Sequence, residues 1–266
     1  MNIDYDHKRE NINELALDMP GEPVRRLTIG WLLLALGSLV VGGLLTIVIV
    51  LSRTPYVQDI FPWVDLFHTA LVVHVDLTVL VWFLGMAGVI WSINSNSGCY
   101  RCGWMALLLC ITGSTIISLS PFLGSASPLM INYIPILNDP LFFSGLLIFG
   151  GGFLLLVLRG LFFSRAIGKH VTGQGAMRFG LFSALISAVT AMGALLASWI
   201  GIPESIQGEY YYELLFWGGG HTLQFVHIQL MLVCWLWLAT ESGIASRLTP
   251  RTVLLLFAFG LVPVLM

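Results

Sequence analysis

Residues 66–92 read LFHTALVVHVDLTVLVWFLGMAGVIWS, an apolar run that contains few polar side chains. A helix of about 20 apolar residues crosses a hydrocarbon core of roughly 30 Å, so the run predicts a transmembrane helix. His68, His74 and Asp76 lie inside it. Ionisable side chains within a span are costly and rare, and they commonly mark function. This stretch therefore predicts both the class of fold and the place to look for chemistry.

Other apolar runs of spanning length lie on both sides of this one. The six predicted spans are 28–51, 66–92, 104–122, 141–163, 179–200 and 214–239, and a seventh run, 252–266, extends only roughly 22 Å at about 1.5 Å per residue. Only 10% of the 266 residues are charged, against about a quarter in soluble domains. We predict an all-α integral membrane protein: a tail at 1–26, then a domain at 27–266 with six complete transmembrane helices and a truncated seventh.

The basic residues predict the orientation of these helices. Eleven of the twelve Lys and Arg residues fall on one side of the predicted membrane, and only Arg53 falls on the other. The side richer in Lys and Arg is normally cytoplasmic, so the N-terminal tail is predicted to be inside. The opposite loops carry interfacial aromatic residues: Trp63, Tyr133, Tyr210, Tyr211 and Tyr212. The net charge of −2 offers no basic surface for nucleic acid, so partners are expected in the membrane.

Depth separates the histidines inside the spans. His74 lies nine residues after Asp65, and His221 lies eight residues after Glu213. Both are therefore roughly 12 to 13 Å below the outer boundary, at one level. Neutral imidazole is the usual protein ligand for heme iron and copper, so this pair predicts a layer of metal ligands.

The remaining histidines are less suited to that role. His68 lies near the headgroups and His227 roughly 21 Å down, and for both we favour a hydrogen bond to a neighbouring helix. His7 in the tail and His170 in a loop are expected to be solvated.

A carboxyl group and an amide add to the polar content of these two spans. Asp76 lies about 200° around the helix from His74 and so occupies another face. Together with Gln224 and His227 it is a candidate for a proton-transfer or polar network.

The two histidine spans resemble each other. HTALVVHVDLTVLVW at 68–82 aligns with HTLQFVHIQLMLVCW at 221–235 without a gap, at an offset of 153 residues. The identities are His68/His221, Thr69/Thr222, Val73/Val226, His74/His227, Leu77/Leu230 and Trp82/Trp235. An offset of four spans predicts a pseudo-symmetric bundle. The repeat pairs His74 with His227 whereas depth pairs it with His221, and we follow depth.

Two shorter patterns have packing explanations. The glycines at 218–220, just before His221, remove side chains from one helical turn, which lets a neighbouring helix or a flat macrocycle approach the backbone. Cys99 and Cys102 form a C-x-x-C without the second pair that a zinc site needs, so we interpret them as a coincidence of the loop.

The two histidine motifs resemble the N-terminal half of the catalytic subunit of the heme-copper oxidase superfamily, which includes cytochrome c oxidases and nitric oxide reductases. HVDLTVLVWFLGMAG from His74 is similar to the family's second helix, and FWGGGHTLQF at 216–225 is similar to its sixth. The resemblance implies that His74 is an axial ligand of the low-spin heme and that His221 is a copper ligand. It also implies a bacterial-type inner (plasma) membrane, other oxidase subunits and a cytochrome-type electron donor.

The sequence departs from the family in two ways. Thr222, Leu223 and Phe225 replace the proline, glutamate and tyrosine of the commonest oxidases, and family members have at least twelve spans that supply further heme and copper histidines. We therefore expect a partial or split catalytic subunit that acts with a companion chain carrying the remaining helices, in electron transfer to oxygen or nitric oxide. The alternative is a non-catalytic membrane protein, an assembly partner or sensor, that retains the oxidase scaffold. A proton-coupled transporter using Asp76 and the histidines is a weaker third reading.

Overall fold

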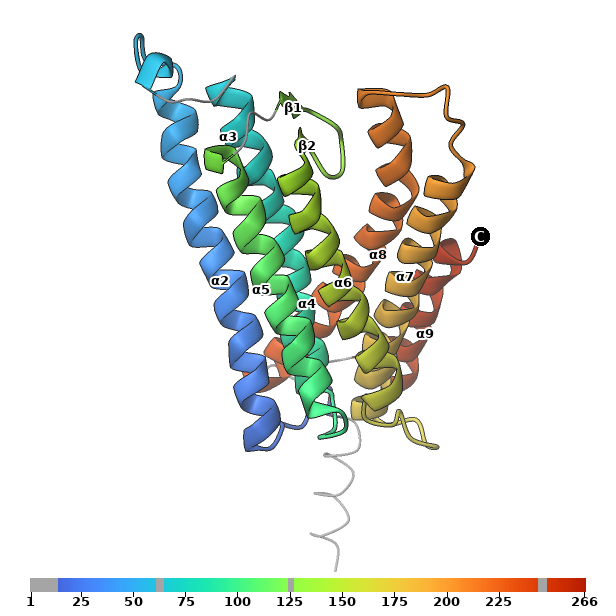
Figure 1. Ribbon diagram of the computed structural model, residues 1–266. Helices are drawn as coiled ribbons and strands as arrows, with labels where there is room; N and C mark the ends of the chain where they lie inside the picture. The colour runs from blue at the N-terminus through green and yellow to red at the C-terminus, as the bar shows by residue number, and fades with distance from the viewer. Residues whose placement is uncertain (1–13, 61–64, 124–126, 244–247) are drawn as a thin grey trace, which may run out of the picture.

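A computed structural model describes residues 14–60, 65–123, 127–243 and 248–266 (Figure 1). The described residues are helical apart from loops and one small hairpin. The elements are α2 (Glu22–Leu51), η1 (Gln58–Ile60), α3 (Leu66–Val75), η2 (Asp76–Val81), α4 (Trp82–Ile93), α5 (Tyr100–Leu123), β1 (Ser127–Leu129), β2 (Ile136–Asn138), α6 (Pro140–Phe163), α7 (Gly173–Gly201), α8 (Glu209–Glu241), α9 (Pro250–Leu261) and η3 (Val262–Val264). Strands β1 and β2 pair antiparallel.

Six helices in the described residues are long and apolar enough to cross a membrane, which confirms the predicted spans. α3, η2 and α4 form one of them, Leu66–Ile93, and η2 is a single π-helical turn within it. Three helices begin five or six residues before their predicted spans: α2 at Glu22 rather than at 28, α7 at Gly173 rather than at 179, and α8 at Glu209 rather than at 214. The apolar seventh run forms α9 and η3 and is shorter than the spans, as expected.

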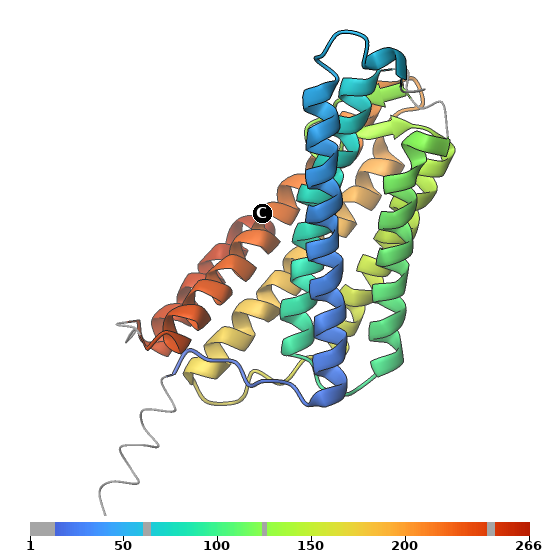
Figure 2. The ribbon, with the colours of Figure 1, turned by 90° about the vertical axis from the view of Figure 1, so that its left-hand side faces the viewer.

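The helices form two groups (Figures 1 and 2). In the first, α2 packs against α3 and α4, and α5 packs against α6; in the second, α8 and α9 both pack against α7. α8 also crosses to meet α4, where the ring centroids of His227 and Phe83 lie 4.6 Å apart with the planes tilted by 35°. Trp91 of α4 donates a hydrogen bond to the carbonyl of Leu181 in α7 and so joins the groups a second time.

Close contact between α5 and α6 depends on glycine. A Cβ at Gly152 of α6 would lie 2.7 Å from Cys110 Sγ and 2.8 Å from the Ala106 carbonyl oxygen, and one at Gly113 of α5 would lie 2.5 Å from the Phe149 nitrogen. Small residues that let backbones approach are the usual basis of helix association in membranes. The helical hairpin of α5 and α6 is therefore stabilised mainly by close van der Waals packing of the two backbones.

The described basic residues follow the predicted asymmetry. α2, α5, α7 and α9 all begin at the same end of the bundle, and the described Lys and Arg residues other than Arg53 lie at or near that end (Figure 1). Lys8, Arg9 and Arg247, together with Trp63 and His7, lie outside the described residues. At this end the tail departs from a simple polar segment: Leu15 and Leu17 are buried, and the Asp18 carboxylate pairs with Arg165 and Arg178.

The loop between α4 and α5 is joined to α6 at the same end. Arg159 of α6 is 3% exposed and donates hydrogen bonds to the Ser95 hydroxyl and to the carbonyls of Asn96 and Cys99. Cys99 is joined to Cys102 by a disulfide. The C-x-x-C that we interpreted as a coincidence of the loop is thus a bonded pair.

Candidate functional site

His74 is the second-last residue of α3, two residues before the first residue of the π-helical turn, and its side chain faces α2. The imidazole Nδ1 lies 2.9 Å from the Gly42 carbonyl oxygen and 3.3 Å from the Thr46 hydroxyl. Because a carbonyl oxygen only accepts hydrogen bonds, Nδ1 must carry the proton in this contact, which leaves the lone pair of Nε2 available. Metal-ligating histidines are held in this way, by donation from the other ring nitrogen.

Gly42 permits this contact. A Cβ at Gly42 would lie 2.6 Å from Thr78 Cγ2, so any larger residue would push α2 away from the turn that follows His74. Thr78 also donates a hydrogen bond to the His74 carbonyl. π-helical turns within α-helices occur frequently at functional sites. The orientation of the His74 imidazole is therefore set by backbone packing between α2 and η2.

His221 has a different environment. It is exposed on α8, and the Tyr133 hydroxyl lies 2.8 Å from its Nδ1 and 2.7 Å from its Nε2. The Trp217 ring meets the imidazole edge-on at 4.5 Å. Burial, with the Glu213 carboxylate nearby, raises the pKa of Tyr133, so its hydroxyl stays protonated and can donate to the imidazole. Tyr133, which the sequence predicts only as an interfacial aromatic residue, is thus the polar neighbour of His221.

The glycines before His221 have two separate neighbours. A Cβ at Gly219 would lie 3.1 Å from the Ala191 carbonyl oxygen of α7, so this glycine accommodates a helix. A Cβ at Gly220 would overlap the Tyr133 ring. The prediction that a neighbouring helix approaches here is confirmed, and the flat group beside the run is a tyrosine from the hairpin loop.

The other candidate polar residues lie apart from one another. Asp76 is 1% exposed, and neither of its carboxylate oxygens has a hydrogen-bond partner among the described residues. The His227 ring contacts the Phe83 ring at a tilt, and Gln224 is exposed on α8. Within the described parts of the chain, no hydrogen bond joins these three residues into a network. His68 pairs at 2.6 Å with Asp65, the N-cap residue of its own helix α3, rather than with a neighbouring helix as predicted.

The described residues hold no group of three or more His, Cys, Asp or Glu side chains that could bind a metal ion. His74 fits the requirement for a single axial ligand, because its free Nε2 is oriented by Gly42. His221 alone does not make a copper site, which needs further ligands. Counted from the helix starts, His221 lies 12 residues into α8 and His74 eight into α3, a difference of roughly 6 Å. A shared level for the two histidines stays a prediction.

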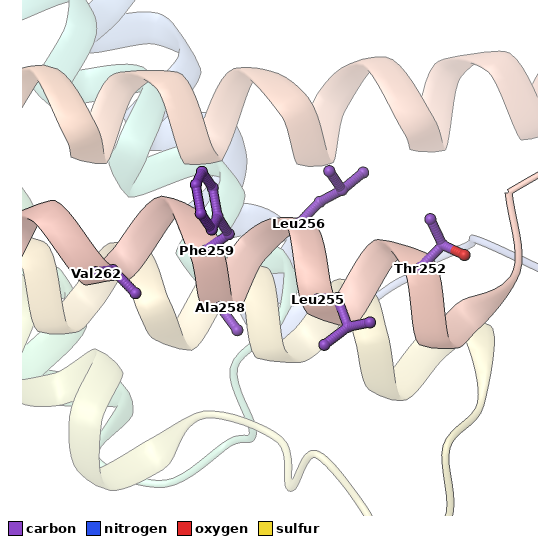
Figure 3. Close-up of a pocket in the computed structure, with 6 residues that line it drawn as sticks. All are labelled: Thr252, Leu255, Leu256, Ala258, Phe259 and Val262. Carbon is purple, nitrogen blue, oxygen red and sulfur yellow. The ribbon is translucent and has the colours of Figure 1, made fainter.

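Figure 3 shows a different surface, an open hollow along α9. It is lined by Thr252, Leu255, Leu256, Ala258, Phe259 and Val262. None of these side chains is ionisable, and most are apolar, as expected of a surface that faces lipid. The hollow therefore offers no catalytic chemistry.

Comparisons with known proteins identify relatives but no activity. No family model matches the chain, and no solved structure matches it. An uncharacterized protein of Rickettsia prowazekii is 27% identical over an alignment of 234 positions that covers 77% of this chain and 45% of that protein. An uncharacterized protein of Aquifex aeolicus is 29% identical over 206 residues, 77% of this chain and 52% of that protein. The chain spans about half the length of the curated relatives it matches.

Proposed function

We propose that this chain is one half of a heme-copper oxidase-type catalytic subunit, in which His74 is an axial ligand of the low-spin heme. The observation that carries the proposal is the hydrogen bond from His74 Nδ1 to the Gly42 carbonyl, 2.9 Å long. A buried structural histidine would satisfy one nitrogen in the same way, but the position of His74 within a span and beside a π-helical turn favours a functional role.

In this proposal His74 binds the heme iron and fixes the direction from which the imidazole approaches it. Donation from Nδ1 selects the tautomer with a free Nε2 and increases the basicity of that nitrogen. Heme bound there would supply one-electron transfer. In this proposal the protein sets the ring orientation, through Gly42 and Thr46, and excludes water by helix packing.

His221 is the proposed copper ligand, and it needs a companion. Copper sites with several histidines require ligands that the described residues of this chain do not bring together. The relatives are about twice as long as the matched region, which agrees with a companion segment that carries the remaining helices. In this proposal the Tyr133 hydroxyl holds the His221 ring until copper and the companion are present.

The family resemblance also suggests the membrane, the electron donor and the electron acceptor of the proposed reaction. The proposed membrane is a bacterial inner membrane with the basic end of the bundle inside, in agreement with the distribution of Lys and Arg. The electron donor is a cytochrome-type protein, and the terminal acceptor is oxygen or nitric oxide.

A heme spectrum of the purified chain tests the proposal. We expect a reduced-minus-oxidised heme band when the chain is purified with its membrane partners, and loss of that band in His74→Ala. His170→Ala is the matched control, because His170 is exposed in a loop and the band should be unchanged. A heme-free preparation from cells whose other oxidases are loaded normally would reject the proposal.

A second candidate is a non-catalytic scaffold that serves as an assembly partner or sensor. The observation in its favour is that the Tyr133 hydroxyl lies within hydrogen-bond distance of the His221 ring nitrogens and can donate to the one without a proton, as in a structural hydrogen bond. In this case His74→Ala would lower the thermal stability of the chain without any change in visible absorbance.

A further inference from the structure

One side of α8 faces away from the other described helices. We call it the α8 stripe: His221, Gln224, Ile228, Met231, Trp235 and Leu238. All six residues are exposed, Trp235 and Leu238 to 60%. They recur at alternating intervals of three and four, which places them on one face of the helix and is the spacing by which helices pack side by side in bundles.

Gln224 makes this face unusual for a surface in lipid. It lies 15 residues after Glu209 and 17 before Glu241, so about 22 Å and 25 Å of helix separate it from the two ends. Its amide has no hydrogen-bond partner in the described part of the chain. Lipid tails cannot hydrogen-bond, and a polar side chain left unpaired near the middle of a membrane is costly.

Gln229 on the same helix shows how this bundle accommodates an amide. It is 2% exposed, accepts a hydrogen bond from Ser183 at 2.9 Å, and donates to the Ser187 hydroxyl and the Gly260 carbonyl, each at 3.4 Å. Its partners come from α7 and α9. Gln224 lacks only the equivalent neighbouring helix.

We propose that the α8 stripe binds a transmembrane helix of the companion segment, and that this helix presents a hydrogen-bonding side chain to Gln224. The curated relatives have as much chain outside the matched region as inside it, enough for further spans. Tyr133 already contacts His221 from the hairpin loop, so the unpaired amide that requires a partner is that of Gln224. The identity of the companion rests on the proposed function, whereas the helix contact itself needs no heme.

Photo-crosslinking in native membranes tests this contact. A photoreactive residue replaces Ile228 on the stripe or, as the matched lipid-facing control, Leu147 of α6, which is 77% exposed. We expect the Ile228 adduct to contain an apolar segment of spanning length with a polar side chain, from a chain segment outside 1–266, and Leu147 to yield lipid adducts. Gln224→Leu should lower the Ile228 yield about threefold, the effect of one hydrogen bond between membrane helices.

Other results would overturn the inference. An Ile228 adduct with a second copy of residues 1–266 would mean self-association, and lipid adducts alone would mean a free surface. An unchanged yield in Gln224→Leu would remove the role of the amide. Gln224 makes no hydrogen bond with the described residues, so the thermal stability of the purified Gln224→Leu chain should equal that of the wild type. A crosslink without a heme band would reject the proposed function alone, and a heme band without a crosslink would reject this inference alone.

Discussion

The His74 imidazole is oriented by the backbone of a glycine. Its hydrogen-bond acceptor is the main-chain oxygen of Gly42, and the absence of a side chain there brings α2 against Thr78. Replacing His74 removes the proposed heme ligand, whereas replacing Gly42 disturbs the backbone that orients it. The two changes therefore separate ligation from positioning.

We predict that Gly42→Ala destabilises the protein by about 1–3 kcal/mol, the usual cost of overpacking. Gly43→Ala is the matched control, because a Cβ there meets nothing within 4 Å. The control should be neutral or slightly stabilising, since Ala is the better helix former. Thermal unfolding in detergent measures both variants, and equal losses of stability would contradict the proposed contact between α2 and η2.

At the level of elements, the sequence predicts where helices run better than where they touch. Span 66–92 matches Leu66–Ile93 almost to the residue because its ends are polar loops. The start of α8 was missed because Tyr210 and Glu213 are helical without being apolar. The β1–β2 hairpin and the Tyr133–His221 contact could not be predicted, because their partners are far apart in sequence and follow only from packing.

The α5–α6 pair provides a test at this scale. Gly152→Ala should destabilise the protein by about 1–3 kcal/mol, because the new methyl group would overlap Cys110 and the Ala106 carbonyl. Gly151→Ala, one residue earlier on the same helix, meets nothing within 4 Å and should be tolerated. The difference between their unfolding temperatures in detergent is the measurement. Similar temperatures would mean that α5 and α6 pack less closely than described.

For the whole molecule, the concentration of basic residues at one end of the bundle is the feature that sequence predicts most directly. The positive-inside rule counts Lys and Arg residues in the loops. Successive spans cross the membrane in opposite directions, so the side on which each loop lies follows from the order of the spans and requires no knowledge of helix packing. The division of the helices into one group from α2 to α6 and another from α7 to α9 could not be predicted from the sequence. It depends on contacts between distant residues, such as Trp91 with Leu181, that leave no periodic pattern in the sequence.

Labelling of single cysteines tests the orientation. In a chain whose native cysteines are replaced, Thr54→Cys should react with a membrane-impermeant maleimide on intact cells, whereas Lys169→Cys should react only after permeabilisation. Both positions are exposed, at opposite ends of the bundle. The reverse pattern would place the N-terminal tail outside.

The π-helical turn η2 also limits the internal repeat. Such a turn is equivalent to one extra residue inserted in an α-helix, so it rotates everything after it by about 100° relative to an uninterrupted helix. The second span contains this insertion, and α8 is an uninterrupted α-helix from Glu209 to Glu241. The gapless alignment therefore holds up to His74/His227, but beyond Asp76 it pairs residues such as Trp82 and Trp235 that point in different directions. A one-residue gap at η2 would restore the correspondence of helix faces in the part of the two spans that follows it.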